Sequence, residues 1–405
     1  MKIAILVWDL NIKGGTQRQA LELALNLQNK GHKVDVFCYV YNKEKCFIDL
    51  CDKLNIYYVT SVDIGLNFNK INKFSFLKKL SRRIFFCNAL FDVFFIKKSL
   101  KIYKKNIEKI HDTSYYDTIN VHDYEIYKIA RILKHKNIIW MMNDIRRAPA
   151  FGKFFIFNLI KKFLNNVLIK LEMNNINKIA VLDGRNKELC KKHYNLEAIV
   201  VRSGVDLDLF NSFTNDRVFK KDNYNIFASN IFYPHRRFED IIDAVEILTK
   251  NGIKNINVTI NGDNSRCFDY YLFIKNRIKE KKLDNYISIV NGVSEKKLLE
   301  YYNNSDIFIF PNHNQTWGLS VFEAMLSGCV CIVSRTSGAS EVLTDSENAI
   351  IIEPKNPKEI ADKILYLIKN YKKMEHISKK GVDFVKNNLS WESYMQDMLK
   401  IFNSV

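Results

Sequence analysis

Two adjacent arginines could hold a phosphate group of a ligand. Arg236 and Arg237 follow Tyr233-Pro234-His235 between an expected strand and an expected helix. A guanidinium group binds phosphate oxygens in a bidentate, charge-assisted way. The same pair is also compatible with solvated side chains in the first turn of a helix. The sequence therefore offers a candidate pyrophosphate contact and leaves the plain surface interpretation open.

The richest polar segment covers residues 311–328 and reads PNHNQTWGLSVFEAMLSG. It follows an expected strand that ends at Phe310, and a helix is expected to begin near Ser320. Ligands of open α/β sheets bind beyond the carboxyl ends of the strands. Glu323 could accept hydrogen bonds from two neighbouring sugar hydroxyls, but Ser320-x-x-Glu323 also has the spacing of a helix capping box. A similar loop with Gly338 follows the next strand.

Two glycines near the N-terminus lie between the first expected strand and the first expected helix. Gly14 and Gly15 permit positive φ and close backbone approach, and the N–H groups of the following helix suit a phosphate. The segment matches neither the GxGxxG nor the GxxxxGK[ST] pattern. A tight strand–helix turn is the alternative. Thr16-x-x-Gln19 has capping-box spacing at the start of that helix.

The elements that must position these residues follow a strand–helix rhythm. Short apolar runs alternate with helical patterns, which predicts parallel βαβ units with both sheet faces covered. The rhythm restarts after a polar stretch near residues 205–223, so two α/β halves are expected. Strands are expected at residues 3–7, 34–40, 118–121, 138–142 and 179–182, and then at 225–228, 257–260, 287–290, 307–310 and 330–333; helices at 16–30, Phe238–Lys250 and 390–402.

Composition and net charge limit the kinds of partner that the protein can have. The chain has 405 residues, 47% hydrophobic and 26% charged, which excludes a disordered chain, and its net charge is +18. Residues 70–110 hold twelve Lys or Arg against two acidic residues, together with many phenylalanines. Such a mixture predicts binding to an anionic membrane surface; a solvated basic face over core phenylalanines is the alternative.

The cysteines and apolar runs bear on the cellular compartment. The eight cysteines form no CxxC pattern, and we interpret them as reduced thiols of a cytosolic protein. The N-terminal apolar run is too short for a signal peptide. The longest apolar stretch, residues 84–96, is shorter than the ~20 residues that span a bilayer.

Taken together, the segments resemble a family 4 retaining glycosyltransferase with the GT-B fold. The matching pieces occur in the family's order over nearly the whole chain: Gly14-Gly15, Ser203-Gly204-Val205-Asp206 with Phe210, Pro234-His235-Arg236-Arg237, Gly262-Asp263, Trp317-Gly318-Leu319 to Glu323-Ala324-Met325, and Ser390-Trp391. The resemblance implies two Rossmann-like, doubly wound parallel-sheet domains facing a cleft. Residues 1–204 would form the acceptor-side domain and 205–385 the donor-nucleotide domain, with a C-terminal helix at 386–405 crossing back.

The resemblance also implies roles for individual residues. Catalytic roles fall on Arg236, Gln315 and Glu323, with Glu323 holding the ribose hydroxyls. Contacts with the nucleotide sugar are expected at Gly14, Gly15, Asn230, Arg237, Gly262, Trp317, Gly318, Leu319 and Gly338. Acceptor-side candidates are His122, Asn143 and Asp144. His122 is selected because it follows the strand expected at 118–121, and a surface histidine with satisfied hydrogen bonds is the alternative.

Three positions depart from the family's pattern. The family commonly has Glu at Gln315, Arg at Asn230 and His at Asn143. A glutamine can bond a sugar hydroxyl but cannot supply negative charge near an oxocarbenium-like carbon. Asp206-Leu207-Asp208 has the DxD form of a metal site, but its place in a junction segment favours a structural role, so no metal and no cofactor are expected.

The predicted function is retaining transfer of a hexose from a nucleotide diphosphate sugar to a cell-envelope glycan or lipid-linked acceptor. The enzyme would lie in the cytoplasm on the inner face of the membrane. A sugar-nucleotide epimerase of the same fold is one alternative. A basic nucleic-acid-binding protein is another, although the sequence shows no RRM, KH or zinc-finger pattern.

Overall fold

The computed structural model describes residues 1–59, 85–122, 126–143, 173–211, 217–265, 267–314 and 316–404. The chain forms two compact units. Unit 1 comprises 1–182, 186–201 and 395–405, and unit 2 comprises 183–185 and 202–394. Apart from residues 183–185, the chain changes unit between residues 201 and 202 and between 394 and 395, where the sequence analysis places the changes between 204 and 205 and between 385 and 386.

Unit 1 is built on a seven-stranded sheet in the order β3-β2-β1-β4-β5-β6-β7, with every neighbouring pair parallel. All five predicted strands are confirmed. The two short edge strands, β3 and β7, were not predicted because two or three residues show no periodicity. The strands are β1 (Lys2–Leu10), β2 (Lys33–Tyr41), β3 (Ile56–Tyr58), β4 (Thr118–His122), β5 (Ile138–Met142), β6 (Lys178–Val181) and β7 (Ile199–Val200).

Helices cover this sheet and close its core. The longer ones are α1 (Gly15–Asn29), α4 (Phe85–Ile110) and α7 (Gly184–Tyr194), and the short ones are α2 (Ile48–Cys51) and α5 (Ala130–Leu133). Short 3-10 turns lie at Lys43–Lys45, Thr113–Tyr115, Ile126–Ile129 and Met173–Asn175. In the core, Trp140 of β5 stacks on Tyr127 with ring centroids 4.4 Å apart. Both rings are almost fully buried, so β5 is central to the unit.

Unit 2 is built on a six-stranded parallel sheet in the order β10-β9-β8-β11-β12-β13. Its five predicted strands are confirmed, and the run of isoleucines at β13 adds a sixth. The strands are β8 (Tyr224–Ser229), β9 (Ile256–Gly262), β10 (Ile287–Asn291), β11 (Ile307–Phe310), β12 (Val330–Ser334) and β13 (Ile350–Ile352). Nearly every side chain of β11, β12 and β13 is buried, as a sheet covered on both faces requires.

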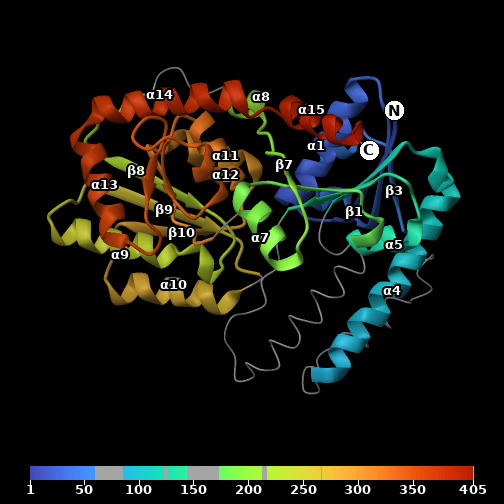
Figure 1. Cartoon of the computed structure of the whole chain (residues 1–405). Helices are drawn as coiled ribbons and strands as arrows, with labels where there is room; N and C mark the ends of the chain where they lie inside the picture. Colours follow the sequence, from blue (N-terminus) through green and yellow to red (C-terminus); the bar gives the residue numbers. More distant parts are fainter. Residues whose placement is uncertain are drawn as a thin grey trace. The chain divides into compact units, whose positions relative to one another are not determined.

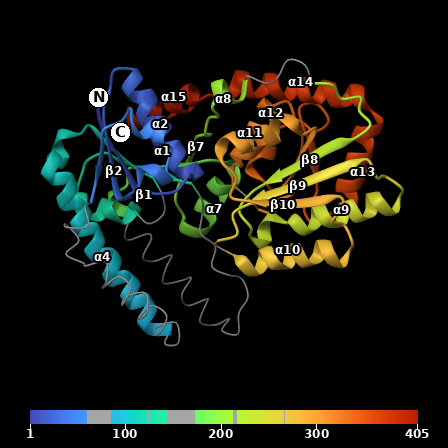
Figure 2. The ribbon, with the colours of Figure 1, turned by 180° about the vertical axis from the view of Figure 1, so that it is seen from behind.

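Two helical layers cover the unit 2 sheet, as Figures 1 and 2 show. Helices α9 (Phe238–Lys250), α10 (Phe268–Glu280) and α13 (Pro357–Lys369) pack on one face, and α11 (Glu295–Asn304) and α12 (Leu319–Leu326) lie on the other. Helix α14 (Tyr371–Asn388) contacts α12 and contributes Met374 and Ile377 to the core. Shorter elements are α8 (Leu207–Asn211) and 3-10 turns at Pro234–Arg236 and Gly338–Val342.

The predicted helix at 238–250 shows how local sequence sets an element. Apolar residues recur on one face of α9, and Phe238, Ile241, Val245 and Leu248 are buried there. The helix ends at Lys250, and Gly252 follows with φ +82°, a left-handed conformation that glycine adopts without steric cost.

Two segments of the resemblance meet inside unit 2. Val205 forms a parallel bridge with Ser390, and the Val205 N–H donates to the Leu389 carbonyl at 2.9 Å. A Cβ on Gly204 would lie 2.4 Å from the Trp391 nitrogen. Only glycine therefore allows this approach just before helix α15 (Trp391–Phe402), whose residues from Met395 onward group with unit 1.

None of the helices that the structure describes combines the length and apolar character needed to cross a bilayer. Seven of the cysteines are described and carry free thiols, and only Cys267 among these seven is not buried.

Candidate functional site

The unit 2 sheet has one point where strand order reverses. The chain adds strands outward from β8 to β10 on one side and from β11 to β13 on the other. Ligands of open α/β sheets bind beyond the carboxyl ends of the strands at such a point. The loops that follow β8 and β11 carry Asn230, Arg236, Trp317 and Gly318, which the sequence analysis selected. The fold therefore places these candidates where a ligand is expected.

Arg236 and Asn230 are joined by an asparagine that the sequence analysis did not select. The amide of Asn312, in the orientation that satisfies its neighbours, accepts from Arg236 Nη1 at 3.1 Å and from Asn230 Nδ2 at 2.8 Å. The same amide donates to the Arg236 carbonyl at 3.1 Å. Asn312 is almost fully buried. It thus fixes both the backbone and the guanidinium of Arg236. Its position directly after Pro311, two residues past β11, was the available signal.

Arg237 is engaged differently from its neighbour. It precedes α9 with φ +57°, and its guanidinium bonds Asp240 at 3.0 Å and forms an ion pair with Glu239 at 2.6 Å. Although burial opposes the charged form, the Asp240 carboxylate raises the pKa of Arg237. The structure therefore shows Arg237 bound to its own helix, and its donor contact stays a prediction.

Gly262 ends β9 beside the same loop. A Cβ there would lie 2.3 Å from the Asn230 carbonyl oxygen and 2.7 Å from the Phe232 ring. The Asn230 N–H in turn donates to the Asn261 carbonyl at 3.0 Å. Glycine is required because the loop after β8 crosses directly over the end of β9.

The loop that leads into α12 is fixed around Trp317. Its indole is buried and donates from Nε1 to the Ser203 carbonyl at 3.1 Å, and its backbone N–H donates to the Asp183 carboxylate at 3.2 Å. A Cβ on Gly338 would lie 2.6 Å from the Trp317 nitrogen, so Gly338 is needed for this packing. The tryptophan acts here as an internal support, and Asp183, which the sequence analysis missed, is its partner.

Gly318 begins the helix that carries Glu323. It has φ +86° and is the N-cap of α12, whose first residue is Leu319. No side chain caps this helix. The capping-box interpretation of Ser320 and Glu323 is therefore wrong, because Ser320 already lies inside the helix. Glu323 instead accepts a hydrogen bond on Oε2 from the Tyr302 hydroxyl at 3.0 Å.

A second polar cluster joins the loops after β11 and β12. The Asn314 N–H donates to Thr336 Oγ1 at 3.1 Å, and the His313 N–H donates to the His235 carbonyl at 2.8 Å. His313, Asn314 and Thr336 were not selected from the sequence, since loop residues show no periodicity. Gln315, a predicted catalytic residue, lies outside the described residues.

In unit 1 the glycine segment differs in detail from expectation. Gly14 is the N-cap of α1 with φ −118°, and Gly15 is the first helical residue. Positive φ is thus not used, and the Thr16–Gln19 capping box is wrong because Thr16 lies inside the helix. A Cβ on Gly14 would lie 2.4 Å from Gln17 Oε1, the end of a flexible side chain that can move aside, so neither φ nor close approach of the backbone requires glycine at this position.

The acceptor-side candidates follow β4 and β5. His122 is the last residue of β4 rather than part of the following loop, and it is fully buried with Nε2 2.6 Å from Asn120 Oδ1. Burial lowers the pKa of His122 to about 3, so its ring is neutral near pH 7. Asn143 follows β5, and its amide hydrogen-bonds no residue in the described part of the chain. Asp144 lies outside the described residues.

The DxD-like segment has a structural contact. Asp206 Oδ1 accepts from the Leu209 N–H at 2.9 Å at the start of α8. Within the described ranges, no group of three or more His, Cys, Asp or Glu side chains is placed to hold a metal ion.

Comparison with known proteins identifies the second half of the chain. Residues 211–383 match the family described as glycosyl transferases group 1. Over these residues the chain is similar to a group 1 glycosyltransferase domain. The protein is accordingly a transferase enzyme, and the Arg236, Glu323 and Gly338 positions all lie inside the matched domain.

Relatives of the glycosyltransferase domain extend over the rest of the chain. A glycosyltransferase of Methanocaldococcus jannaschii is 22% identical over 420 residues, covering 99% of this chain and 98% of that protein. A second glycosyltransferase of that organism is 22% identical over 237 residues, and the chain spans 62% of its length. The capsular polysaccharide biosynthesis glycosyltransferase CapM of Staphylococcus aureus is 28% identical over 106 residues, 26% of this chain and 28% of CapM.

Solved structures share the fold. HepE of Anabaena, in complex with UDP and glucose, has a TM-score of 0.72 and 14% identity with full coverage of both chains. WaaG, a glycosyltransferase involved in lipopolysaccharide biosynthesis, has a TM-score of 0.68 and 12% identity, also with full coverage. The predicted GT-B fold with two parallel-sheet α/β domains is confirmed.

Proposed function

We propose that the enzyme transfers a hexose, with retention of anomeric configuration, from a nucleotide diphosphate sugar to a cell-envelope glycan or lipid-linked acceptor. The observation that carries the proposal is the cluster of Arg236, Asn312 and Asn230 at the strand-order reversal of the glycosyltransferase domain. It holds one guanidinium in a fixed orientation at the edge of the sheet where ligands bind.

We assign individual residues roles in binding the donor and in the transfer reaction. Arg236 would bind the diphosphate and stabilise the negative charge that grows on the leaving phosphate. Glu323 would accept hydrogen bonds from the ribose hydroxyls, and Gln315 with the backbone of Gly318 and Leu319 would orient the sugar and diphosphate. The acceptor hydroxyl would attack from the face of the leaving group, and the leaving phosphate would take its proton. This route uses no protein nucleophile and, we propose, no metal.

Two named relatives support the substrate classes. HepE was solved with UDP and glucose, which supports a nucleoside diphosphate sugar as donor. CapM is named for capsular polysaccharide biosynthesis, which supports a cell-envelope acceptor. We place acceptor binding in unit 1, where the neutral His122 ring would serve as a hydrogen-bonding group rather than as a proton donor.

We further propose that residues 70–110 bind anionic lipid and hold the enzyme peripherally on the inner face of the membrane. In the described part, α4 extends away from the unit 1 sheet, and Lys98, Lys101, Lys105 and Lys109 are exposed along it. Tyr103 of the same helix is buried and donates from its hydroxyl to the Val7 carbonyl at 3.1 Å, so this aromatic side chain faces the protein and not a lipid surface. Residues 70–84, and the side chains of 85–97, lie outside what is described.

Vesicle flotation tests the lipid proposal on the full chain. Binding to vesicles with anionic lipid should exceed binding to neutral vesicles and fall with salt, because each basic residue near the surface adds ~1 kcal/mol. Equal binding to both vesicle types, or to neither, contradicts it.

A nucleotide-sugar panel tests the transferase proposal. UDP- and GDP-sugars are screened by thermal shift, since a ligand at 100 times its Kd adds ~2.7 kcal/mol of stability. The stabilising donor is then incubated with and without polysaccharide or lipid-linked acceptors, in the presence of EDTA. Acceptor-dependent transfer with the α/β configuration of the donor sugar kept is expected. Donor turnover without acceptor would indicate an epimerase, and loss of transfer in EDTA would contradict the metal-free route.

A further inference from the structure

A buried tyrosine contacts the carboxylate to which we assign ribose binding. Tyr302 lies in the last turn of α11, is fully buried, and donates from its hydroxyl to Glu323 Oε2 on α12 at 3.0 Å. A buried phenol hydroxyl requires a hydrogen-bond partner. Burial and the neighbouring Glu323 carboxylate raise the pKa of Tyr302 well above its ordinary value. The hydroxyl therefore stays protonated and donates at any pH at which the enzyme works.

The ring of Tyr302 cannot turn its hydroxyl away. Three phenylalanine rings surround it, with ring centroids at 5.9 Å for Phe210, 5.4 Å for Phe227 and 5.7 Å for Phe308. The three rings meet it edge-on or tilted rather than stacked. Close packing of this kind leaves the tyrosine a single rotamer.

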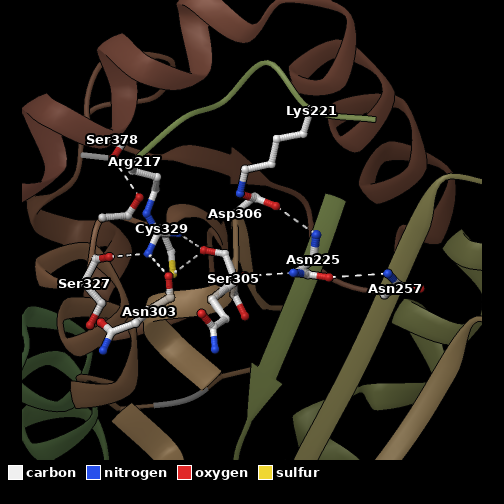
Figure 3. Close-up of polar contacts among 12 residues, drawn as sticks. Arg217, Lys221, Asn225, Asn257, Asn303, Ser305, Asp306, Ser327, Cys329 and Ser378 are labelled. Atoms are coloured by element: carbon white, nitrogen blue, oxygen red, sulfur yellow. Dashed lines mark hydrogen bonds and ion pairs between the residues drawn. The ribbon is translucent and has the colours of Figure 1, made fainter. Parts of the chain in front are cut away.

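The backbone at Tyr302 is held as well, by Arg217, whose position beside Asn303, Ser305 and Ser327 is shown in Figure 3. Arg217 donates from Nη2 to the carbonyls of Tyr302 at 3.2 Å and Asn303 at 2.7 Å, and from Nη1 to the Ser305 carbonyl. The same Nη2 donates to the carbonyl of Ser327 at 2.5 Å, the residue that ends α12. One guanidinium thus ties the C-terminal ends of the two helices that carry Tyr302 and Glu323.

We propose that Tyr302 is a positioning residue: its hydroxyl fixes the Glu323 carboxylate in the one orientation that receives the ribose hydroxyls of the donor nucleotide. This inference rests on the proposed function, because it assigns Glu323 to the ribose. Glu323 is only half-buried, and the hydrogen bond from the Tyr302 hydroxyl favours the observed rotamer of its side chain over others. A carboxylate that must be ordered by the ligand binds it more weakly than one ordered beforehand.

A tyrosine that only filled the core would support all ligand contacts alike. A positioning tyrosine affects the ribose contact selectively. The ratio of the Kd for a 2′-deoxynucleotide to the Kd for the ribonucleotide reports that contact alone, because base and diphosphate are the same in both ligands.

The test uses the full chain with Tyr302→Phe, which keeps the ring and removes the hydroxyl. Tyr301→Phe is the matched control: it makes the same change one residue earlier in α11, where the ring stacks on Phe227 at 5.3 Å. Calorimetry gives Kd values for UDP, 2′-deoxy-UDP, GDP and 2′-deoxy-GDP. For the base that binds, we expect the ratio of the 2′-deoxynucleotide Kd to the ribonucleotide Kd to be about 10 or more in the wild type. Tyr302→Phe should lower this ratio about 3-fold or more. The Tyr301→Phe ratio should equal the wild-type ratio.

An unchanged ratio in Tyr302→Phe overturns the inference, whether both affinities fall together or neither changes. Glu323→Gln separates this failure from failure of the proposed function. If Glu323→Gln lowers the ratio and Tyr302→Phe does not, only the role of Tyr302 is wrong. If Glu323→Gln also keeps the wild-type ratio, the ribose assignment itself is wrong.

A second variant covers the case in which Tyr302→Phe does not fold. p-Aminophenylalanine in place of Tyr302 keeps the ring shape and a weaker donor at the same position. The ratio is then expected to fall about 2-fold, and a wild-type ratio would overturn the inference equally.

Discussion

Arg236 and Arg237 are adjacent in sequence but have different partners. Arg237 Nε donates to Asp240 Oδ2 at 3.0 Å within its own helix. Arg236 Nη1 instead donates to the Asn312 amide, in the loop after the strand β11 that neighbours β8, at 3.1 Å. Arg237 itself has a left-handed backbone with φ +57°. One guanidinium supports α9, and the other lies among the loops at the ligand edge of the sheet.

This difference predicts that alanine at Arg236 lowers activity, whereas alanine at Arg237 lowers stability. Arg236→Ala should lower kcat/KM for the donor roughly 10–100-fold, from the ~1.5–3 kcal/mol of a charge-assisted hydrogen bond. Arg237→Ala should leave kcat/KM within about 3-fold but lower stability by about 2 kcal/mol, since the buried Asp240 loses its partner. Steady-state kinetics and denaturant unfolding check both. Equal kinetic losses in the two variants would show that Arg236 has no special contact with the donor.

Glu323→Gln should affect catalysis and leave stability nearly unchanged. Gly318 provides the N-cap of α12, and a glutamine oxygen can still accept from Tyr302. The ribose contact that we propose for Glu323, however, would lose charge assistance and gain a donor where an acceptor is needed. We expect a fall in kcat/KM of roughly 10-fold or more with the Tm within about 2 °C of wild type. A large drop in Tm with kinetics intact would make Glu323 a structural residue.

Gly262→Ala should impair both stability and donor binding. The new Cβ would lie 2.3 Å from the Asn230 carbonyl oxygen, so the loop after β8 must move. We expect a loss of about 1–3 kcal/mol and a weaker donor Kd. Gly292→Ala is the control, because its φ of +63° strains the backbone but nothing lies within 4 Å of the new Cβ. It should lose about 1 kcal/mol and keep its donor Kd. Identical donor affinities in the two variants would contradict the role of Gly262.

Arg217→Ala should destabilise unit 2 by about 4 kcal/mol, because four hydrogen bonds to carbonyl groups are lost. Its guanidinium satisfies carbonyl groups at the ends of both α11 and α12, and each lost bond costs about 1 kcal/mol. Arg335→Ala is the contrast, since the 60% exposed Arg335 side chain pairs with the exposed Glu353 and should contribute almost nothing. Urea unfolding gives the free energy of unfolding of each variant. Similar losses in Arg217→Ala and Arg335→Ala would contradict the stabilising role of the Arg217 contacts.

His122 should make the stability of unit 1 depend on pH. Its pKa of about 3 in the folded state lies below the ordinary 6.5, so below pH 6.5 the unfolded chain binds a proton that the folded chain does not. Stability is thus complete above pH 6.5 and is lost as the pH falls toward 3, by ~1.4 kcal/mol per pH unit.

The measurement compares unfolding of wild type and His122→Asn at pH 7.5 and 5.0. The wild type should lose ~2 kcal/mol more than the variant over this range. His376→Asn, at an exposed position, controls for the removal of a histidine. Parallel pH dependence of wild type and His122→Asn would contradict the lowered pKa, because it would show that the ring binds a proton as readily in the folded as in the unfolded state.

The sequence by itself determined the elements and their order. Apolar periodicity located ten strands and the bounds of α9. This works because the residues that a strand or helix buries recur at a regular interval along the sequence. The segments around Gly318 and Gly338 were found for a similar reason: glycine at a strand end marks a sharp turn or a close approach. The short strands at the sheet edges were missed because a run of two or three residues has no period.

Only the tertiary structure decided which side chains meet. Tyr302 and Glu323 are 21 residues apart, Asp183 and Trp317 are 134 apart, and no spacing rule connects either pair. The parallel sheet brings the ends of distant strands to one edge, and packing between helices then selects the partner of each polar group. The position of Asn312 just past β11 marked it only as a residue of the loop, and its contact with Arg236 appeared once the fold placed the two together, since a buried polar side chain is defined by the neighbours that satisfy it.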